Sequence, residues 1–151
     1  MPNNPHKMFH ILLADDDEGD RLLFTDAFSE LKIKTIVQTV NNGTQLMESL
    51  GVKILPSPYF LFLDLNMPPT NGLACLKEIK SNEKLKDVFI AIYSTSDSEQ
   101  DMEDTFINGA DVYITKPNDF HSLKLVLEKA VVMATQYQDP RMKRENFLLK
   151  A

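Results

Sequence analysis

The chain has 151 residues, 43% hydrophobic and 25% charged, which is typical of one soluble domain with a full-sized core. Its formal net charge of −6 argues against non-specific binding to nucleic acid or to an anionic membrane. A single cysteine, Cys75, excludes an internal disulfide and favours a reducing compartment. No apolar run is long enough to span a bilayer, and the N-terminus lacks the apolar core of a signal peptide, so we expect a cytoplasmic protein.

Short apolar runs alternate with segments of helical periodicity along the chain. The most apolar run, YFLFLDLN at 59–66, contains one carboxylate, Asp64, and stops before Pro68 and Pro69, which cannot continue a strand ladder. We therefore expect a central strand that is buried on both faces, with Asp64 at its carboxyl end. In chain order the predicted elements are strand 8–14, helix 20–31, strand 34–40, a short helix after a turn at 41–43, strand 59–66, helix 73–81, strand 88–93, helix 98–108, strand 111–115 and helix 119–137.

Five strands that alternate with five helices predict an α/β fold, with one doubly wound parallel sheet between two layers of helices. We expect one domain at 8–137, a frayed N-terminal tail at 1–7, and a C-terminal tail or helix extension at 138–151. The last residues, RMKRENFLLKA, are locally basic, and a solvated end or helix extension is the simpler interpretation. Packing of the FLL segment at 147–149 on a partner is the alternative.

Four of the predicted strands end at residues with reactive side chains. Asp15 and Asp16 follow the first strand, Asp64 lies near the end of the third, Ser94 follows the fourth and Lys116 follows the fifth. The carboxyl ends of parallel strands meet at one edge of the sheet, where this class of fold binds its ligands. Carboxylates this close repel one another, so they require counter-charges, which the lysine and a divalent cation would supply.

This arrangement predicts a Mg²⁺ site, because carboxylate and carbonyl oxygens are the ligands that Mg²⁺ prefers. A carboxylate beside a metal ion and a lysine is also a competent nucleophile for phosphoryl transfer, which would give an aspartyl phosphate at position 64. The Ser94 hydroxyl would donate a hydrogen bond to a phosphoryl oxygen. The predicted metal ligands are the carboxylates of Asp16 and Asp64, the carboxylate of Asp15 directly or through water, and the backbone carbonyl of Asn66.

Four stretches together resemble the receiver domain of two-component response regulators, the chemotaxis-regulator-like family: ILLADDDEGD, FLFLDLNMPPTNG, AIYSTSD and GADVYITKP. The resemblance spans 8–137 and implies a flavodoxin-like fold with a five-stranded sheet in the order 2-1-3-4-5. It also implies a cis peptide bond between Lys116 and Pro117. The implied roles are phosphoacceptor for Asp64, metal-binding acidic pair for Asp15 and Asp16, hydroxyl switch for Ser94, switch aromatic for Tyr113, essential lysine for Lys116, and phosphoryl-lifetime positions for Asn66 and Ser96.

The chain departs from the family pattern in three places. Ala14 is smaller than the aliphatic residue that is more usual there, which affects packing rather than chemistry. Ser94 keeps the hydroxyl of the more usual threonine, and counting back from Lys116 favours it over its hydroxyl neighbours Thr95 and Ser96. The connection at 51–58 is longer than in many receivers.

The resemblance implies a stand-alone, single-domain response regulator of a two-component phosphorelay. Asp64 would accept a phosphoryl group from a sensor histidine kinase or a histidine phosphotransfer protein in a Mg²⁺-dependent reaction. Phosphorylation would draw Ser94 inward and let Tyr113 fill the vacated space, which changes a face formed by the fourth helix, fifth strand and fifth helix. A downstream protein partner would bind this face. Beyond phosphorylation from a donor and autodephosphorylation we expect no enzymatic activity, and we expect no nucleic-acid or membrane partner.

Three other functions are considered. An aspartate-nucleophile phosphatase of the haloacid-dehalogenase type requires a second aspartate two residues after the nucleophile, and this chain has Asn66 there. A nucleotide or flavin binder requires a phosphate-binding glycine-rich loop, which the sequence lacks. A degenerate receiver that binds partners without phosphorylation is disfavoured, because every residue type of the site is present.

Overall fold

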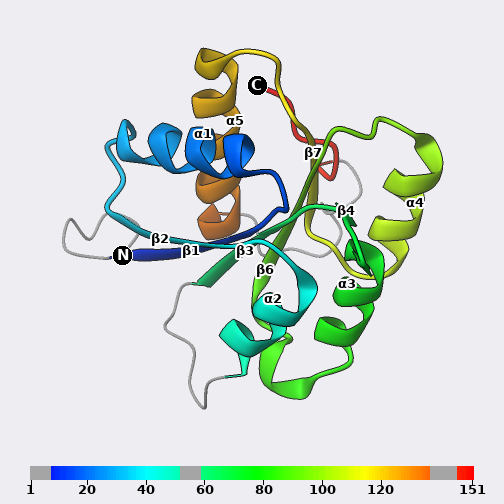
Figure 1. The fold of residues 1–151 in the computed structure, drawn as a ribbon. Helices are drawn as coiled ribbons and strands as arrows, with labels where there is room; N and C mark the ends of the chain where they lie inside the picture. The colour runs from blue at the N-terminus through cyan, green and yellow to red at the C-terminus, as the bar shows by residue number, and fades with distance from the viewer. Residues whose placement is uncertain (1–7, 52–58, 137–145) are drawn as a thin grey trace.

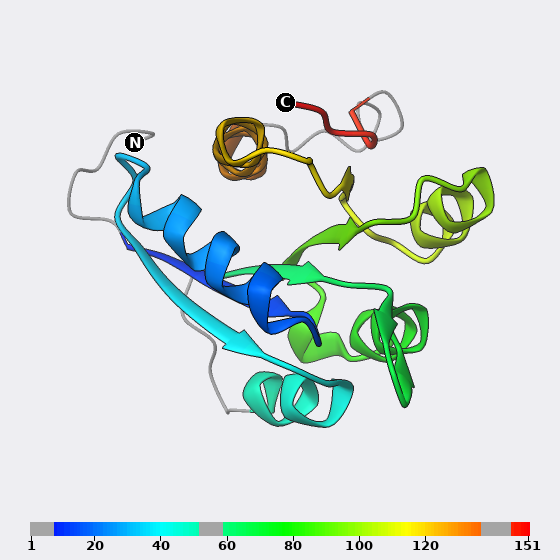
Figure 2. The same ribbon diagram turned by 45° about the horizontal axis from the view of Figure 1, so that its top comes forward.

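The computed structural model describes residues 8–51, 59–136 and 146–151. A five-stranded parallel sheet in the order β2-β1-β3-β6-β7 lies between two layers of helices (Figures 1 and 2). Because β6 and β7 are the fourth and fifth strands of this sheet, the predicted fold and strand order are confirmed. The elements are β1 Phe9–Ala14, α1 Glu18–Ser29, β2 Thr35–Val40, α2 Gly43–Leu50, β3 Tyr59–Leu63, β4 Asn66–Met67, β5 Thr70–Asn71, α3 Gly72–Lys80, a 3-10 turn Glu83–Leu85, β6 Phe89–Ser94, α4 Glu99–Ile107, β7 Val112–Thr115 and α5 Phe120–Gln136.

The core has two halves, one on each face of the sheet. Helices α1 and α5 pack against one face, and α2, α3 and α4 pack against the other (Figure 2). Side chains of the central strand β3 point alternately to the two faces of the sheet and so contribute to both halves of the core. Phe60 and Phe62 face α1 and α5, whereas Leu61 and Leu63 face the other layer. This strand is therefore buried on both faces, as predicted. Each such side chain contributes about 1.5–3 kcal/mol by leaving water.

The chain around Asp64 differs from the prediction, because β3 ends at Leu63 and not at Asn66. The next residues form a small antiparallel hairpin of β4 and β5, in which Asn66 pairs with Asn71. Its turn holds Pro68 and Pro69, which are joined by a cis peptide bond. The expectation that the prolines end the long strand is therefore wrong: β3 ends five residues before Pro68, and the prolines lie in the turn of the hairpin.

The expected cis bond between Lys116 and Pro117 is wrong, since this bond is trans in the structure. The trans isomer is favoured for bonds before proline by about 0.5–1 kcal/mol. With the trans bond, the Lys116 side chain already contacts all of its carboxylate partners, so the packing of the site does not require the less stable isomer.

The end of the chain is packed against the domain. Phe147 is 4% exposed and residues 146–151 form no helix, whereas Leu148 and Lys150 are exposed. This segment lies beside β7 (the red segment in Figure 1). The expectation for 138–145 lies outside the described residues. The expectations for the N-terminal tail at 1–7 and for the connection at 51–58 fall almost entirely on residues outside the described ranges.

Candidate functional site

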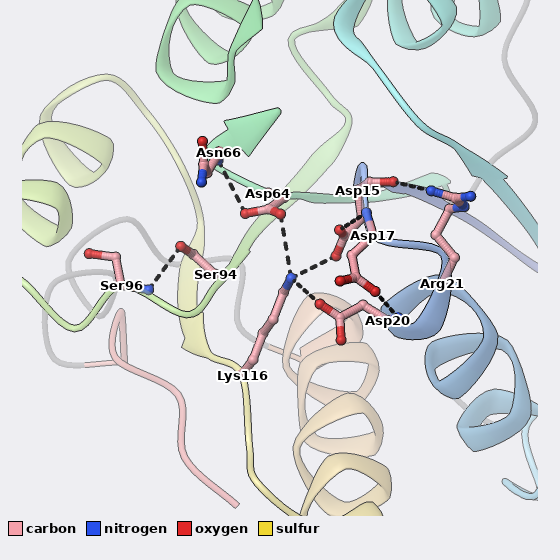
Figure 3. Close-up of polar contacts among 9 residues, drawn as sticks. All are labelled: Asp15, Asp17, Asp20, Arg21, Asp64, Asn66, Ser94, Ser96 and Lys116. Carbon is pink, nitrogen blue, oxygen red and sulfur yellow. Dashed lines mark hydrogen bonds and ion pairs between the residues drawn. The ribbon is translucent and has the colours of Figure 1, made fainter. Parts of the chain in front are cut away.

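The site lies at the edge of the sheet where β1, β3, β6 and β7 end. The strands are in register there: Ala14 pairs with Leu63, Leu63 with Ile92, and Ser94 with Thr115. Strands that end at the same level bring the residues that follow them together. This register is the reason that side chains far apart in the sequence converge in Figure 3.

Lys116 is the centre of this cluster. Its Nζ lies 2.8 Å from Asp15 Oδ2, 2.7 Å from Asp20 Oδ2 and 3.4 Å from Asp64 Oδ2. Its side chain is only 9% exposed, so these ion pairs are largely shielded from water. Burial by itself would lower the pKa of Lys116, but the hydrogen bonds to Asp15 and Asp20 outweigh it and raise the pKa. The side chain is therefore a permanent ammonium among carboxylates.

Asp20 is the functional-site residue that sequence reasoning missed. The sequence marked it only as an acid near the start of a helix, favourable to the helix dipole. In the structure α1 begins at Glu18, earlier than predicted, because Asp17 caps the helix and accepts a hydrogen bond from Asp20 N at 2.9 Å. This cap places the first turn of α1 over the sheet edge, where Asp20 reaches Lys116. Recognition of Asp17 as the N-cap would have placed Asp20 in the first turn of the helix, next to the sheet edge.

Asp64 is 5% exposed and lies between Lys116 and the hairpin (Figure 3). Burial raises its pKa to about 6; Lys116 opposes the rise, and the Asp15 carboxylate adds to it. Its Oδ1 accepts a hydrogen bond from Asn66 N at 3.2 Å, which holds the carboxyl plane in place. Burial therefore disfavours the charged form of Asp64, and a further cation beside the carboxylates would favour it.

Asp15, Asp16 and Asp64 fit such a cation. One carboxylate oxygen from each lies within 4.8 Å of the others. Mg²⁺ binds oxygens at about 2.0–2.1 Å in an octahedron, so opposite ligands lie about 4 Å apart. Small side-chain movements would therefore bring the three oxygens onto one ion. Asp15 and Asp64 are buried and Asp16 is exposed, so an ion held by these three residues would be accessible to water.

Of the two predicted switch residues, Ser94 is the last residue of β6 and Tyr113 lies in the neighbouring strand β7. Ser94 is 2% exposed, and its hydroxyl accepts a hydrogen bond from Ser96 N at 3.1 Å. The Ser96 side chain in turn donates to Asp101 in α4 at 2.6 Å. The Tyr113 hydroxyl donates to the Ser96 carbonyl at 2.8 Å, and this residue is 1% exposed. Tyr113 is thus already inward in this structure, linked through Ser96 to both Ser94 and α4.

A cavity of about 270 Å³ opens beside these residues, lined by Asn66, Ser94, Ser96 and Asp101 among others. Asn66 is exposed and Ser96 is half-buried, and their role as phosphoryl-lifetime positions stays a prediction. The Asn66 backbone carbonyl as a metal ligand stays a prediction.

Gly72, the first residue of α3, supports the site from behind. Its N–H donates to the Leu65 carbonyl at 2.9 Å. A Cβ at this position would overlap the Asp64 carbonyl oxygen and lie 2.6 Å from Leu65 Cα. The backbone that carries Asp64 can approach α3 this closely only because residue 72 has no side chain.

None of the helices in the described part of the chain is long and apolar enough to cross a membrane. The chain is 29% identical over 126 residues to a probable methanogenesis regulatory protein, FilR2, of Methanothrix harundinacea, and the match covers 80% of each. It is 29% identical over 125 residues to the response regulator Rcp1 of Synechocystis, covering 80% of this chain and 84% of Rcp1.

Solved structures of response regulators are also similar to this chain. The Mn²⁺-bound form of Rcp1 matches with a TM-score of 0.69 and 25% identity, covering 87% of this chain and 95% of that one. The phosphorylated cyanobacterial phytochrome response regulator RcpA matches with a TM-score of 0.72 and 26% identity, and the match covers 84% of this chain and 94% of RcpA. The family model of the response regulator receiver domain matches residues 11–128, most of the chain. Together with the converging acids and Lys116, this match shows that the chain belongs to the response regulator receiver domain family.

Proposed function

We propose that this chain is a response regulator with its receiver domain at 8–137, in which Asp64 accepts a phosphoryl group in a Mg²⁺-dependent reaction. The observation that carries the proposal is the convergence of Asp15, Asp16, Asp64 and Lys116 at one sheet edge, with three carboxylate oxygens within 4.8 Å and a lysine ammonium 3.4 Å from the acceptor. A Mn²⁺-bound Rcp1 and a phosphorylated RcpA among the similar structures support the same chemistry.

In this mechanism one Asp64 carboxylate oxygen attacks phosphorus while the bond from phosphorus to the donor breaks, and the donor leaves with that bond's electron pair. Asp15, Asp16, Asp64 and the Asn66 carbonyl would hold Mg²⁺, which would supply positive charge for the phosphoryl oxygens. Lys116, already within reach of Asp64, neutralises another oxygen. The Ser94 hydroxyl rotates from its Ser96 N–H to donate to the phosphoryl group.

The phosphoryl group then leaves by hydrolysis, and Asn66 and Ser96, which line the same cavity, affect its lifetime in this proposal. The donor is a sensor histidine kinase or a histidine phosphotransfer protein, and the setting is cytoplasmic. The α4–β7–α5 face contacts a downstream protein, since Ser94 and Tyr113 connect the acceptor to that face through Ser96. Neither a membrane nor a nucleic acid is required as a partner.

The test is the intact mass of the protein after incubation with Mg²⁺ and acetyl phosphate. We expect one added phosphoryl group on the wild type, none on Asp64→Asn, and none when EDTA is present. Asp26→Asn, an exposed acid of α1 away from the site, is the matched control and should be phosphorylated like the wild type. An adduct that persists in Asp64→Asn would refute the assigned acceptor. No adduct together with no binding of beryllofluoride would favour a phosphorylation-independent interaction module.

A further inference from the structure

Strand β7 is at the edge of the sheet, so the outer side of its backbone has no partner strand among the described elements. The C-terminal segment, residues 146–151, occupies this side. Tyr113 N donates to the Phe147 carbonyl at 2.6 Å, and Leu149 N donates to the Tyr113 carbonyl at 2.9 Å. These bonds form a parallel bridge between Tyr113 and Leu148. The segment therefore satisfies the exposed edge in the manner of a short added strand.

The side chains of this segment pack against both faces of the sheet at its β7 edge. Phe147 is 4% exposed, and its ring centroid lies 5.1 Å from that of Phe106 in α4 and 6.2 Å from that of Tyr113. Leu149 packs against the half of the core formed with α1 and α5. Leu148, between them, is 49% exposed. Two apolar anchors separated by one exposed residue thus straddle β7.

The C-terminal segment does not fill all of the space beside β7. A cavity of about 240 Å³ remains beside the segment, lined by Met102, Tyr113, Val126, Leu148 and Leu149 among others. Among the described residues, a hydrogen bond from Lys129 Nζ to the Lys150 carbonyl at 2.8 Å also holds the segment. Ordering these residues costs backbone entropy, which offsets much of the gain from burying one phenylalanine. Such a contact can open locally while the domain stays folded.

We infer that the outer edge of β7 is a strand-docking site, and that residues 146–149 are its resident ligand in the folded chain. The partner that fits is an extended peptide that pairs in parallel with β7, with an aromatic side chain against Phe106 and Tyr113 and a leucine two residues later. This is recognition by strand addition, in which the backbone gives affinity and the side chains give specificity. Such a peptide can bind only after the chain's own segment has left.

Phosphorylation is not needed for this site to exist. Its contacts are with β7, α4 and α5, and none of them involves Asp64 or Lys116. Tests without Mg²⁺ and without a phosphodonor therefore examine the docking site alone. Failure of these tests and failure of the phosphoacceptor proposal are distinguishable.

The experiment uses the full chain and a fluorescent peptide with the sequence of residues 144–151, RENFLLKA. In Phe147→Ala the resident segment loses its anchor, so we expect this variant to bind the peptide at least tenfold more tightly than the wild type. Leu148→Ala removes an exposed side chain of the same segment and should bind as the wild type does. A peptide with alanine in place of its phenylalanine should not bind any of the three proteins.

Amide hydrogen exchange is the second measurement. Protection of the Tyr113 and Leu149 N–H groups should fall in Phe147→Ala and be unchanged in Leu148→Ala, with the sheet amides protected in both. If Phe147→Ala is folded but binds the peptide no better than the wild type, the docking site is refuted. A concentration-dependent dimer of the wild type that Phe147→Ala abolishes would instead show that the segment binds a second copy, and would overturn its assignment as a ligand of its own chain.

Discussion

Strand β7 contributes to two regions that differ in stability: the charged site beyond its carboxyl end and the C-terminal segment along its outer edge. Beyond its carboxyl end, Lys116 is buried among three carboxylates, and every group depends on the register of the whole sheet. Along its side, Tyr113 holds the C-terminal segment with two backbone hydrogen bonds and one aromatic neighbour, Phe147. The first region is tied to global folding, whereas the second can open by itself. The difference shows that a functional centre and a removable cover can share one strand.

The largest effect that would test this contrast is expected from Lys116→Met. The substitution leaves Asp15 and Asp64 buried without their counter-charge, and breaking a buried ion pair costs about 3–5 kcal/mol. We expect a loss of this size in the free energy of urea unfolding at pH 7.5 without metal, with partial recovery in Mg²⁺. Lys124→Met, which breaks an exposed pair with Glu30, is the control and should cost less than about 1 kcal/mol. Equal losses in both variants would contradict a buried charge centre.

Asp64→Asn should increase the free energy of unfolding in the absence of metal, by less than Lys116→Met decreases it. Because the pKa of Asp64 rises from 3.8 to about 6 on folding, mainly through burial, the folded state holds its proton more tightly. The contribution of this carboxyl to stability is complete below pH 3.8 and is lost as the pH rises through 6. Without metal, the variant should therefore be more stable than the wild type by about 1–3 kcal/mol at pH 8, and by little at pH 4.

Urea unfolding across pH 4 to 8 measures this difference. Asp26→Asn, whose carboxyl is exposed, should show no such pH-dependent gain. Saturating Mg²⁺ should reverse the order at pH 8, because an ion bound by the native carboxylates stabilises only the wild type. A variant less stable than the wild type at pH 8 without metal would mean that Lys116 fully compensates Asp64.

The smallest effect on global stability is expected from Phe147→Ala. A phenylalanine in a domain core costs about 3–5 kcal/mol when truncated to alanine. The segment that carries Phe147 can instead detach, so the loss is limited to its own docking energy, about 1 kcal/mol. Phe62→Ala, a fully buried residue of β3, is the matched core control in the same urea experiment. Equal losses at positions 147 and 62 would show that the segment is part of the cooperative core.

Much of the site was predictable because it depends on strand ends. Apolar runs mark the strands, and parallel strands bring their carboxyl ends to one edge of the sheet. The sequence alone therefore predicts that Asp15, Asp64 and Lys116 lie together. Asp20 could not, because its contact depends on where α1 begins and on the angle at which it crosses the sheet. The close approach of Gly72 to the Asp64 carbonyl likewise depends on the position of α3.

The C-terminal segment marks the limit of sequence reasoning most clearly. Its residues are few, and a phenylalanine and two leucines among polar and basic neighbours carry no period that predicts a strand or a helix. By itself the sequence determined the alternating elements, the sheet they form and the reactive groups at its edge, because hydrophobic periodicity is local. Only the tertiary structure decided that Asp20 contacts Lys116 and that Phe147 covers Tyr113. Both contacts join residues that are distant in the chain, so they exist only once the sheet has placed them side by side.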